Sequence, residues 1–396
     1  MNTRILVKKL VPDSFRMLYR KLRTGIIKAE FRLFRLAPVK QNRVALCNVW
    51  GFGDNPKWVA KALLDRNVRA KEECSVEPEI VFITDTSKKQ EIPKGIRTLK
   101  NNSPAAIYAL ATARVWLDCN RKEPFILKRK GQYYIQTWHG SIPLKKIEKD
   151  ALAELTEEYK KNAERDTRMT DLYISNSDFC NELYKRAFGY NGRVFVCGSP
   201  RIDVLLKGFN GRDDELRVVY APTFRGDGRR MSVSEDGQCV LEALETRFGK
   251  RAVPIKRLHP LCTASAAKAG EGEGLSFGNA IDGNEQGDIY ELLSQADVLI
   301  TDYSNTMFEF ALTGRPVFLY APDSAEYESE RGMYFKYDSL PFPKAATAEE
   351  LSRKILEYDE EEYRSRQKEF FDGLKLIENG RASEKVARVI LRVLNR

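Results

Sequence analysis

The chain contains only two histidines, His139 and His259, and these are its residues best suited to acid–base chemistry near neutral pH. An imidazole titrates near pH 6.5, so it can take a proton from a hydroxyl under physiological conditions. Each histidine follows an apolar run typical of a buried strand, and open α/β sheets bind ligands where such strands end. The alternative is that both are structural histidines. Their matching positions in two halves of one chain favour function.

A candidate phosphate-binding turn lies at residues 302–306, directly after an apolar run at 297–301. Ser304, Asn305 and Thr306 are all helix-capping residues, and Thr306 with Glu309 fits a capping box. One interpretation is that they only cap a helix. The other is that free backbone N–H groups and the helix dipole at this strand end also attract phosphate oxygens.

Arg225 lies in a matching position, after the first predicted strand of the second half. Its planar, permanently charged guanidinium suits phosphate, although an arginine in a surface turn is unremarkable by itself. The chain lacks the glycine-rich signatures of nucleotide sites and has no Asp-x-Asp pattern for a nucleotide-bound metal. We therefore expect no metal and no cofactor. The chemistry that remains is transfer at a phosphate site, using histidine and arginine.

The elements that must position these residues follow a repeated strand–helix pattern. Short apolar segments alternate with helical ones, which predicts parallel sheets covered by helices on both faces. A polar linker at 208–214 precedes a second run of the same pattern. We predict an α/β fold of two tandem, doubly wound, Rossmann-like domains at 43–210 and 211–375, with a cleft between them, and a C-terminal helix at 376–396. We also expect a charged helix at 149–166 and a loop at 269–287.

The N-terminal segment, residues 1–42, differs from the rest in charge. The first 43 positions hold twelve basic and two acidic residues, which accounts for the whole net charge of +10. From Phe15 to Ala37, apolar residues recur on one helical stripe opposite the basic ones. The stripe consists of Phe15, Leu18, Tyr19, Leu22, Ile26, Ala29, Leu33 and Leu36. Such a basic amphipathic helix is typical of peptides on anionic membranes. The alternative is a helix that docks on the protein's own body.

Composition narrows the class of protein further. No apolar run is long enough to cross a bilayer, and the N-terminus lacks a secretory signal. Seven scattered cysteines without a Cys-x-x-Cys pair indicate a reducing compartment and argue against a disulfide framework or a zinc site. The body outside the N-terminal segment is electrically balanced, which argues against nucleic-acid binding. We expect a peripheral protein at the cytoplasmic face of the cell membrane.

Several short motifs, taken together and in order, resemble the CDP-glycerol glycerophosphotransferase family, the bacterial enzymes of teichoic-acid and related polymer synthesis. They lie at residues 55–57, 136–141 with 143–147, 175–177, 198–203, 221–225, 259–260 and 302–304. The resemblance runs from about residue 43 to 325 and implies the two-domain GT-B architecture. The chain departs from the common family pattern at Ser141, Ile142, Ile202 and Asn305.

This resemblance implies transfer of a polyol phosphate, most often glycerol phosphate, from its CDP-activated form to an acceptor hydroxyl, with release of CMP. His139 would then be the base, and the residues beside it on the acceptor side would be Trp138, Gly140 and Ser141. His259 would join it as a catalytic residue, facing the pyrophosphate. The donor-binding residues would be Arg225, Arg257, Asp302, Tyr303, Ser304 and Asn305, with Glu309 at a ribose hydroxyl.

The implied partners are CDP-glycerol or CDP-ribitol, a lipid-linked glycan or polyol-phosphate acceptor and an anionic membrane surface, and an oligomer is compatible with the sequence. Two other functions remain open at this point. One is a GT-B glycosyltransferase or epimerase that uses a nucleotide sugar. The other is a non-catalytic, membrane-attached scaffold, against which both histidines and Arg225 count.

Overall fold

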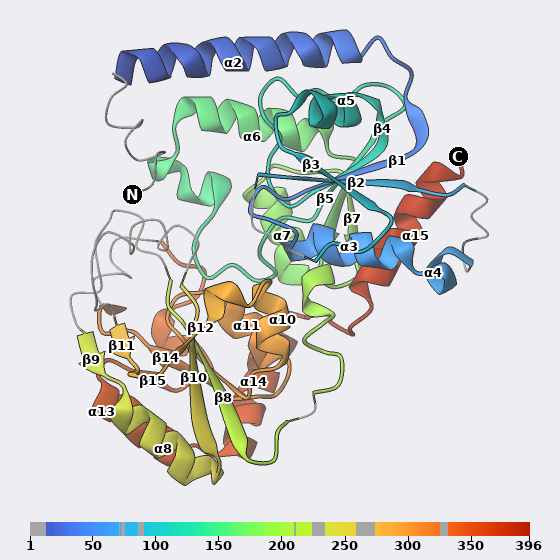
Figure 1. Cartoon of the computed structure of the whole chain (residues 1–396). Coiled ribbons are helices and arrows are strands. Elements are labelled where there is room, and N and C mark those ends of the chain that lie inside the picture. The colour runs from blue at the N-terminus through green and yellow to red at the C-terminus, as the bar shows by residue number, and fades with distance from the viewer. Residues whose placement is uncertain are drawn as a thin grey trace.

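Two α/β domains make up the body of the protein, each built on a parallel β-sheet. The computed structural model describes residues 13–70, 72, 76–85, 91–209, 211–223, 234–258, 274–324 and 332–396. In Figure 1 the first domain lies above the second, and helix α2 runs across the top of the first. The expected fold class of two doubly wound, parallel-sheet domains is confirmed.

The first domain is organised around seven parallel strands in the order β3-β2-β1-β4-β5-β6-β7. They are β1 (Lys40–Cys47), β2 (Glu79–Thr84), β3 (Ile96–Lys100), β4 (Ala113–Asp118), β5 (Tyr133–Gln136), β6 (Leu172–Ser175) and β7 (Arg193–Val196). The central strands are continuous apolar runs because helices cover both faces of the sheet. The strand order reverses between β1 and β4, and the crevice at the carboxyl ends of such strands is the usual ligand site.

Helices pack on both faces of this sheet. They are α3 (Asp54–Leu64), α4 (Arg66–Ala70), α5 (Pro104–Thr112), α6 (Glu157–Met169) and α7 (Asp178–Arg186), with short 3-10 helices η1 (Glu148–Glu154) and η2 (Pro200–Ile202). Alternate residues of β1 face opposite cores, as the pleat requires. Val44 and Leu46 pack with α3, whereas Ala45 packs with α5.

The second domain contains six parallel strands in the order β12-β10-β8-β13-β14-β15 and a separate pair, β9 and β11. Its strands are β8 (Glu215–Ala221), β9 (Ser234–Asp236), β10 (Arg251–Lys256), β11 (Gly274–Ser276), β12 (Ile281–Asp282), β13 (Val298–Thr301), β14 (Val317–Tyr320) and β15 (Lys344–Ala345). Its helices are α8 (Gln238–Phe248), α10 (Ile289–Ser294), α11 (Thr306–Ala311), α13 (Ala348–Leu356), α14 (Glu360–Gly373), η3 (Gly283–Glu285) and η4 (Tyr337–Ser339). The order reverses between β8 and β13, which places a second switch point at the ends of these strands.

The C-terminal helix α15 (Ala382–Leu394) returns from the second domain to the first. Val386, Ile390 and Leu391 are fully buried in the core that contains α3. The Asp203 carboxylate caps this helix, since it accepts hydrogen bonds from the backbone N–H groups of Ala382 (2.9 Å) and Ser383 (2.7 Å). A segment from the end of the chain therefore completes the first domain.

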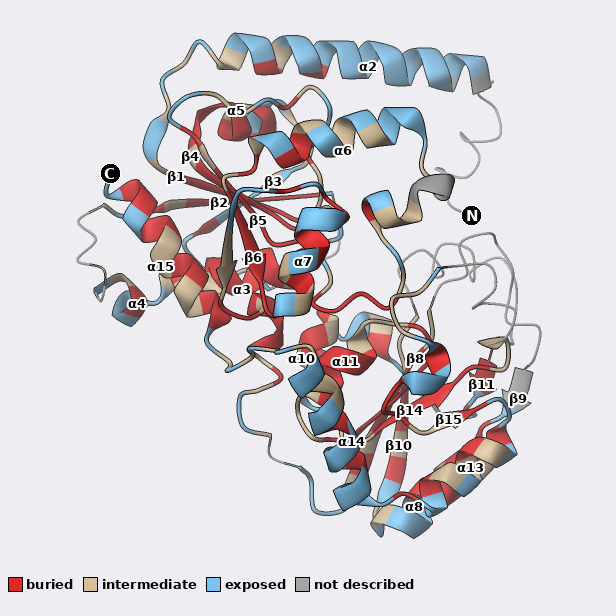
Figure 2. Ribbon diagram, turned by 180° about the vertical axis from the view of Figure 1, so that it is seen from behind, coloured by how far each residue is buried: buried red, intermediate tan, exposed pale blue. Residues whose placement is uncertain are grey.

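Helix α2 (Asp13–Phe34) packs on the body through a face that the sequence did not single out. Ile27 and Phe31 are buried, and the Phe34 ring meets that of Tyr108 edge-on at 5.4 Å. The expected apolar stripe faces away from the body instead, as Figure 2 shows by the exposed outer side of α2. More than half of the surface is exposed in each of these members of the stripe: Phe15, Leu18, Tyr19, Leu22, Ile26, Leu33 and Leu36. The helix thus docks by one apolar face and exposes another.

Two local expectations were wrong. The charged helix at 149–166 is broken into η1 and α6, because Thr156 leaves the helical conformation and its side chain caps α6. Within the described part of 269–287, short strands β11 and β12 replace the expected loop. Across the described residues, no helix combines the length and the apolar character that crossing a bilayer requires.

The segment that leads into α15 generates a prediction about stability. The Glu378 carboxylate accepts hydrogen bonds from the Ser199 N–H and the Asn176 amide, and burial raises the pKa of Glu378 from 4.5 to about 8. Between these values the folded protein keeps a proton that the unfolded chain releases. The free energy of unfolding should therefore fall as pH rises from about 4.5 to 8.

Glu378→Gln keeps the shape of the protonated acid and should remove the share of this pH dependence that Glu378 contributes. At pH 8 it should be more stable than the wild type by on the order of 1–3 kcal/mol, with near equality at pH 4.5. Urea unfolding across this range measures the difference. Glu361→Gln, at an exposed site on α14, is the control and should follow the wild-type curve. If the unfolding free energy of Glu378→Gln changes with pH in parallel with that of the wild type, the prediction is contradicted.

Candidate active site

His139 lies just beyond β5, beside the carboxyl end of β4. Its Nδ1 is 2.8 Å from the carbonyl oxygen of Cys119, and its ring stacks on Trp138 with centroids 4.2 Å apart. A carbonyl only accepts hydrogen bonds, so Nδ1 carries the proton and Nε2 of the neutral ring keeps its lone pair. The side chain is exposed although residues 134–138 are buried. Solvent therefore reaches this residue at the end of β5.

The surroundings of His139 favour the neutral, proton-accepting form. The surrounding protein encloses the ring, and this burial lowers the pKa of His139 below its ordinary value of 6.5. The nearby cation of Arg201 acts in the same direction, whereas Asp54 and the hydrogen bond to Cys119 oppose it. The imidazole is consequently neutral at pH 7, as a general base must be.

Two side chains hold the backbone of the histidine loop. Trp138 has a left-handed backbone with φ +54°, a costly conformation for a bulky residue. The Asn55 amide donates to the Trp138 carbonyl (3.0 Å), and the Arg201 guanidinium donates to the His139 carbonyl (2.9 Å). These bonds come from α3 and η2, and they fix the direction in which the imidazole points.

Beyond Gly140 the same loop enters the second domain. Ile142 and Leu144 are buried within that domain's hydrophobic core. The Leu144 N–H donates to the side chain of Asn305 (3.0 Å), and the Lys146 N–H donates to the Gly332 carbonyl (2.8 Å). His139 therefore sits on a loop anchored at one end in each domain.

A buried ion pair between Arg201 and Glu309 joins the two domains at this point. Glu309, on α11, is fully buried; one oxygen accepts from Arg201 Nε (3.2 Å) and from the Ser141 hydroxyl (3.0 Å). Its other oxygen accepts from the Tyr290 hydroxyl (2.5 Å). Arg201 also bonds Asp54 at 3.0 Å. Every charge in this cluster has a partner, as burial demands.

This arrangement corrects part of the predicted donor site. Glu309 is enclosed by protein and cannot reach a ribose hydroxyl, and it forms no capping box, since the cap residue Asn305 makes no side-chain cap bond. Ser141 and Trp138 are likewise buried, so Gly140 is the partly open neighbour of His139. The local capping pattern was misleading because the partner of Glu309 lies 108 positions away in sequence.

Of the other predicted donor residues that the structure describes, Asp302, Tyr303 and Ser304 follow β13, and Arg257 follows β10. Asp302 is buried and accepts from the Thr223 N–H (2.9 Å), which ties β13 to the exit of β8. The Tyr303 hydroxyl donates to Asp323 (2.9 Å). Ser304, half-buried, accepts a hydrogen bond from the Thr306 hydroxyl (2.7 Å). Arg257 donates to the carbonyls of Gly283 and Gly287, so it braces the loop before α10.

Arg225 and His259 lie outside the described residues, each a short step beyond a described strand. Thr223, two positions before Arg225, is fixed by Asp302 at the second switch point. Among the described side chains, no three His, Cys, Asp or Glu residues converge as a metal site would require. Arg201, Asp54 and Tyr290 were not predicted as site residues from the sequence. The family motifs at 55–57 and 198–203 lie in or beside this cluster, but they do not indicate which residues form ion pairs.

Comparison with known proteins identifies the family. The sequence profile of the CDP-glycerol:poly(glycerophosphate) glycerophosphotransferases matches residues 29–392. The chain belongs to this family. The resemblance noted from the motifs is confirmed.

Several curated relatives are teichoic acid polymerases. The teichoic acid poly(glycerol phosphate) polymerase of Bacillus subtilis is 29% identical over 94% of this chain, and that of Bacillus spizizenii is 28% identical over 95%. This chain covers 52% of the first relative and 98% of the second. It also covers 44% of the Staphylococcus epidermidis polymerase, so it spans about half the length of two of these relatives.

Solved structures of the wall teichoic acid polymerase TagF share the whole fold. A histidine variant of TagF soaked with CDPG has a TM-score of 0.76 and 26% identity, and covers 96% of this chain and 98% of its own. The unsubstituted TagF structure has a TM-score of 0.74, with 26% identity over 96% of this chain. The two-domain arrangement described above is therefore the arrangement of TagF.

The interdomain ion pair yields a testable prediction. Arg201→Leu leaves Glu309 and Asp54 charged and without their cation in a buried site, which should cost about 3–5 kcal/mol of unfolding free energy. Arg212→Leu removes a surface ion pair with Glu215 and should cost less than about 1 kcal/mol. Urea unfolding of both variants provides the comparison, and equal midpoints would show that the Arg201 pair does not hold the domains together.

Proposed function

We propose that this chain transfers glycerol phosphate from CDP-glycerol to a hydroxyl of a lipid-linked glycan or polyol-phosphate acceptor, releasing CMP, during synthesis of a teichoic-acid-like or capsular polymer. The observation that carries the proposal is the exposure, tautomer and lowered pKa of His139 in a chain that belongs to this family. The residue is exposed, its tautomer is set by the Cys119 carbonyl, and its pKa is lowered. The poly(glycerol phosphate) polymerases among the relatives support the same reaction.

In this mechanism Nε2 of His139 takes the proton of the acceptor hydroxyl. The acceptor oxygen forms a bond to the phosphorus that carries glycerol, and the bond from that phosphorus to the bridging oxygen of CDP-glycerol breaks. CMP leaves with the bonding electrons, and its developing charge needs neutralisation. The loop that carries the base is fixed from both domains, which keeps the attacking oxygen in line with the leaving group.

We assign charge neutralisation to Arg225 and His259, with Ser304 as a further donor to the phosphates. All three follow strands β8, β10 and β13, whose carboxyl ends flank the second switch point. Asp302 has an indirect part in this assignment, since it fixes Thr223 at the start of the segment that contains Arg225. The donor would then lie on the second domain and the acceptor on the first.

Replacement of His139 tests the proposed base. His139→Gln should lower turnover by roughly 10²–10⁴-fold while the affinity for CDP-glycerol stays nearly unchanged. For the wild type, turnover should fall only at acid pH, below about 6.5, because the lowered pKa keeps the imidazole neutral above it. Nucleotide release measures the reaction: CMP from CDP-glycerol or CDP-ribitol, and UDP from UDP-sugars as comparison donors. Near wild-type turnover in His139→Gln would exclude His139 as the base.

We further propose that α2 attaches the enzyme to an anionic membrane near its acceptor. The supporting feature is the outward apolar stripe of α2, flanked by basic residues in a segment that carries the chain's whole excess charge. Burial of exposed apolar side chains in the interfacial region and attraction to anionic lipid would act together. Docking through Ile27 and Phe31 would hold this surface rigidly on the first domain.

The triple variant Leu18→Gln/Leu22→Gln/Ile26→Gln tests the membrane proposal without disturbing the docked face. Co-sedimentation with phosphatidylglycerol vesicles should weaken by at least about tenfold, since each side chain loses on the order of 1 kcal/mol of transfer free energy. Leu356→Gln, an equally exposed leucine on α13, should bind like the wild type. High salt should also weaken binding. Unchanged sedimentation of the triple variant would refute this role of α2.

A further inference from the structure

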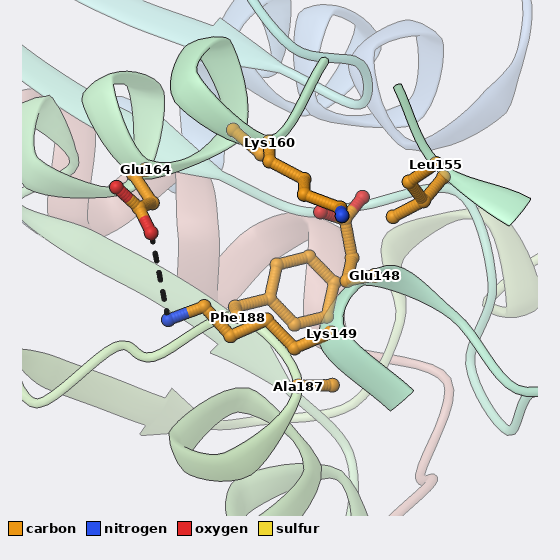
Figure 3. A pocket seen from close by; sticks show the side chains of 8 residues that line it. Glu148, Lys149, Leu155, Lys160, Glu164, Ala187 and Phe188 are labelled. Atoms are coloured by element: carbon orange, nitrogen blue, oxygen red, sulfur yellow. Dashed lines mark ion pairs between the residues drawn. The ribbon is translucent and has the colours of Figure 1, made fainter. Parts of the chain in front are cut away.

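A cavity of about 230 Å³ lies in the first domain, between η1, α6 and the residues that follow α7. Figure 3 shows the Phe188 ring in the middle of its lining, with Glu148 and Lys149 beside it and Lys160 and Glu164 toward α6. Leu155, Ala163 and Ala187 complete an apolar lining. The cavity thus joins an aromatic wall to four charged side chains, and none of these residues belongs to the site described above.

The inner wall of the cavity is connected directly to the base. The Phe188 ring meets Trp138 edge-on at 4.8 Å, and Trp138 stacks on His139 at 4.2 Å. The Arg121 guanidinium lies over both Phe188 and Trp138, at 5.2 and 5.5 Å from their ring centroids. A ligand in the cavity would therefore be separated from His139 by only two packed rings, on the acceptor's side of the molecule.

Residues with strained backbones lie on both sides of the packed Phe188 and Trp138 rings. Glu148, at the cavity, has φ +53°, and Trp138, at the base, has φ +54°. Such conformations are costly for residues other than glycine and are kept where the surroundings fix them, often at functional sites. Glu148 is fixed by Arg121 (2.8 Å) and by the Tyr159 hydroxyl (2.6 Å), which hold its carboxylate in place.

The charges at the cavity suit an anionic, hydroxyl-bearing ligand. Glu148 is paired with Arg121, which it shares with Asp166, and burial raises the pKa of Asp166 to about 6. Among the described residues, the one ion pair of the Lys149 ammonium is a long contact with Glu164 (4.0 Å). Lys160 pairs with Glu157, three positions earlier on α6 (2.7 Å). Solvent-exposed pairs of this kind contribute little, so a phosphate can take over both ammonium groups at small cost.

We propose that this cavity binds a polyol-phosphate unit of the acceptor, away from the hydroxyl that reacts. In this site the phosphate contacts Lys149 and Lys160, the carbon chain lies against Phe188, and the Glu164 carboxylate accepts from a free hydroxyl. The proposal rests on the proposed function and adds a second recognition site for its acceptor. Such a site would select acceptors that already carry polyol phosphate, because remote contacts position the reacting end.

Steady-state kinetics with two acceptors tests the site. The probes are a synthetic poly(glycerol phosphate) oligomer and glycerol 3-phosphate, which is too short to occupy both sites. The variant Lys149→Ala/Lys160→Ala should raise the KM for the oligomer by about tenfold or more. The kcat, the KM for CDP-glycerol and the reaction with glycerol 3-phosphate should not change. Lys161→Ala, an exposed lysine of α6 outside the cavity lining, is the matched control.

A second variant separates the cavity from general surface charge. Ala163→Phe keeps both lysines but fills the cavity, so it should also raise the KM for the oligomer, with thermal unfolding as the check on folding. If the oligomer KM is unchanged in either variant, or rises equally in Lys161→Ala, the proposal is overturned while the transfer function stands. If the wild type releases no CMP from CDP-glycerol with either acceptor, the proposed function itself fails.

Discussion

The buried charge of Arg201 is the constraint on which the geometry of this molecule depends. A guanidinium removed from water must be paired and fully hydrogen-bonded, and its partners here come from both domains. The same group holds the carbonyl of His139. The position of His139 and the mutual position of the domains are thus set by one set of bonds, so a shift of either domain would disturb the imidazole.

The two sheets explain why such a junction can serve a transfer reaction. Each parallel sheet has a switch point, and the loop after β5 reaches the residues that follow β13, where the Leu144 N–H bonds the Asn305 side chain. Residues after Gly140 insert into the core of the second domain, which makes the histidine loop part of both halves. A site assembled in this way can hold one substrate on each wall and keep the reacting atoms aligned.

Much of the fold follows from local patterns, whereas the pairing of charges does not. Apolar runs and helical segments predicted two parallel-sheet domains, because period and burial are readable in short windows. Glu309 was misassigned, since its capping pattern is local and its partner Arg201 is distant in sequence. Helix α2 shows the same limit: one apolar stripe was found by periodicity, but the face that docks became evident only with α5 in place. His139 stays a prediction from sequence, made because only two histidines occur in this chain.

The return of α15 to the first domain has a consequence for how the protein is made. The core around α3 stays incomplete until Val386, Ile390 and Leu391 have left the ribosome. After η2 is synthesised, the nascent chain must extend through the entire second domain, about 180 residues, before α15 begins. At roughly 5–20 residues per second this lasts on the order of 10–40 seconds. During that interval the emerging first domain exposes an apolar surface, which makes it a natural client for a ribosome-associated chaperone.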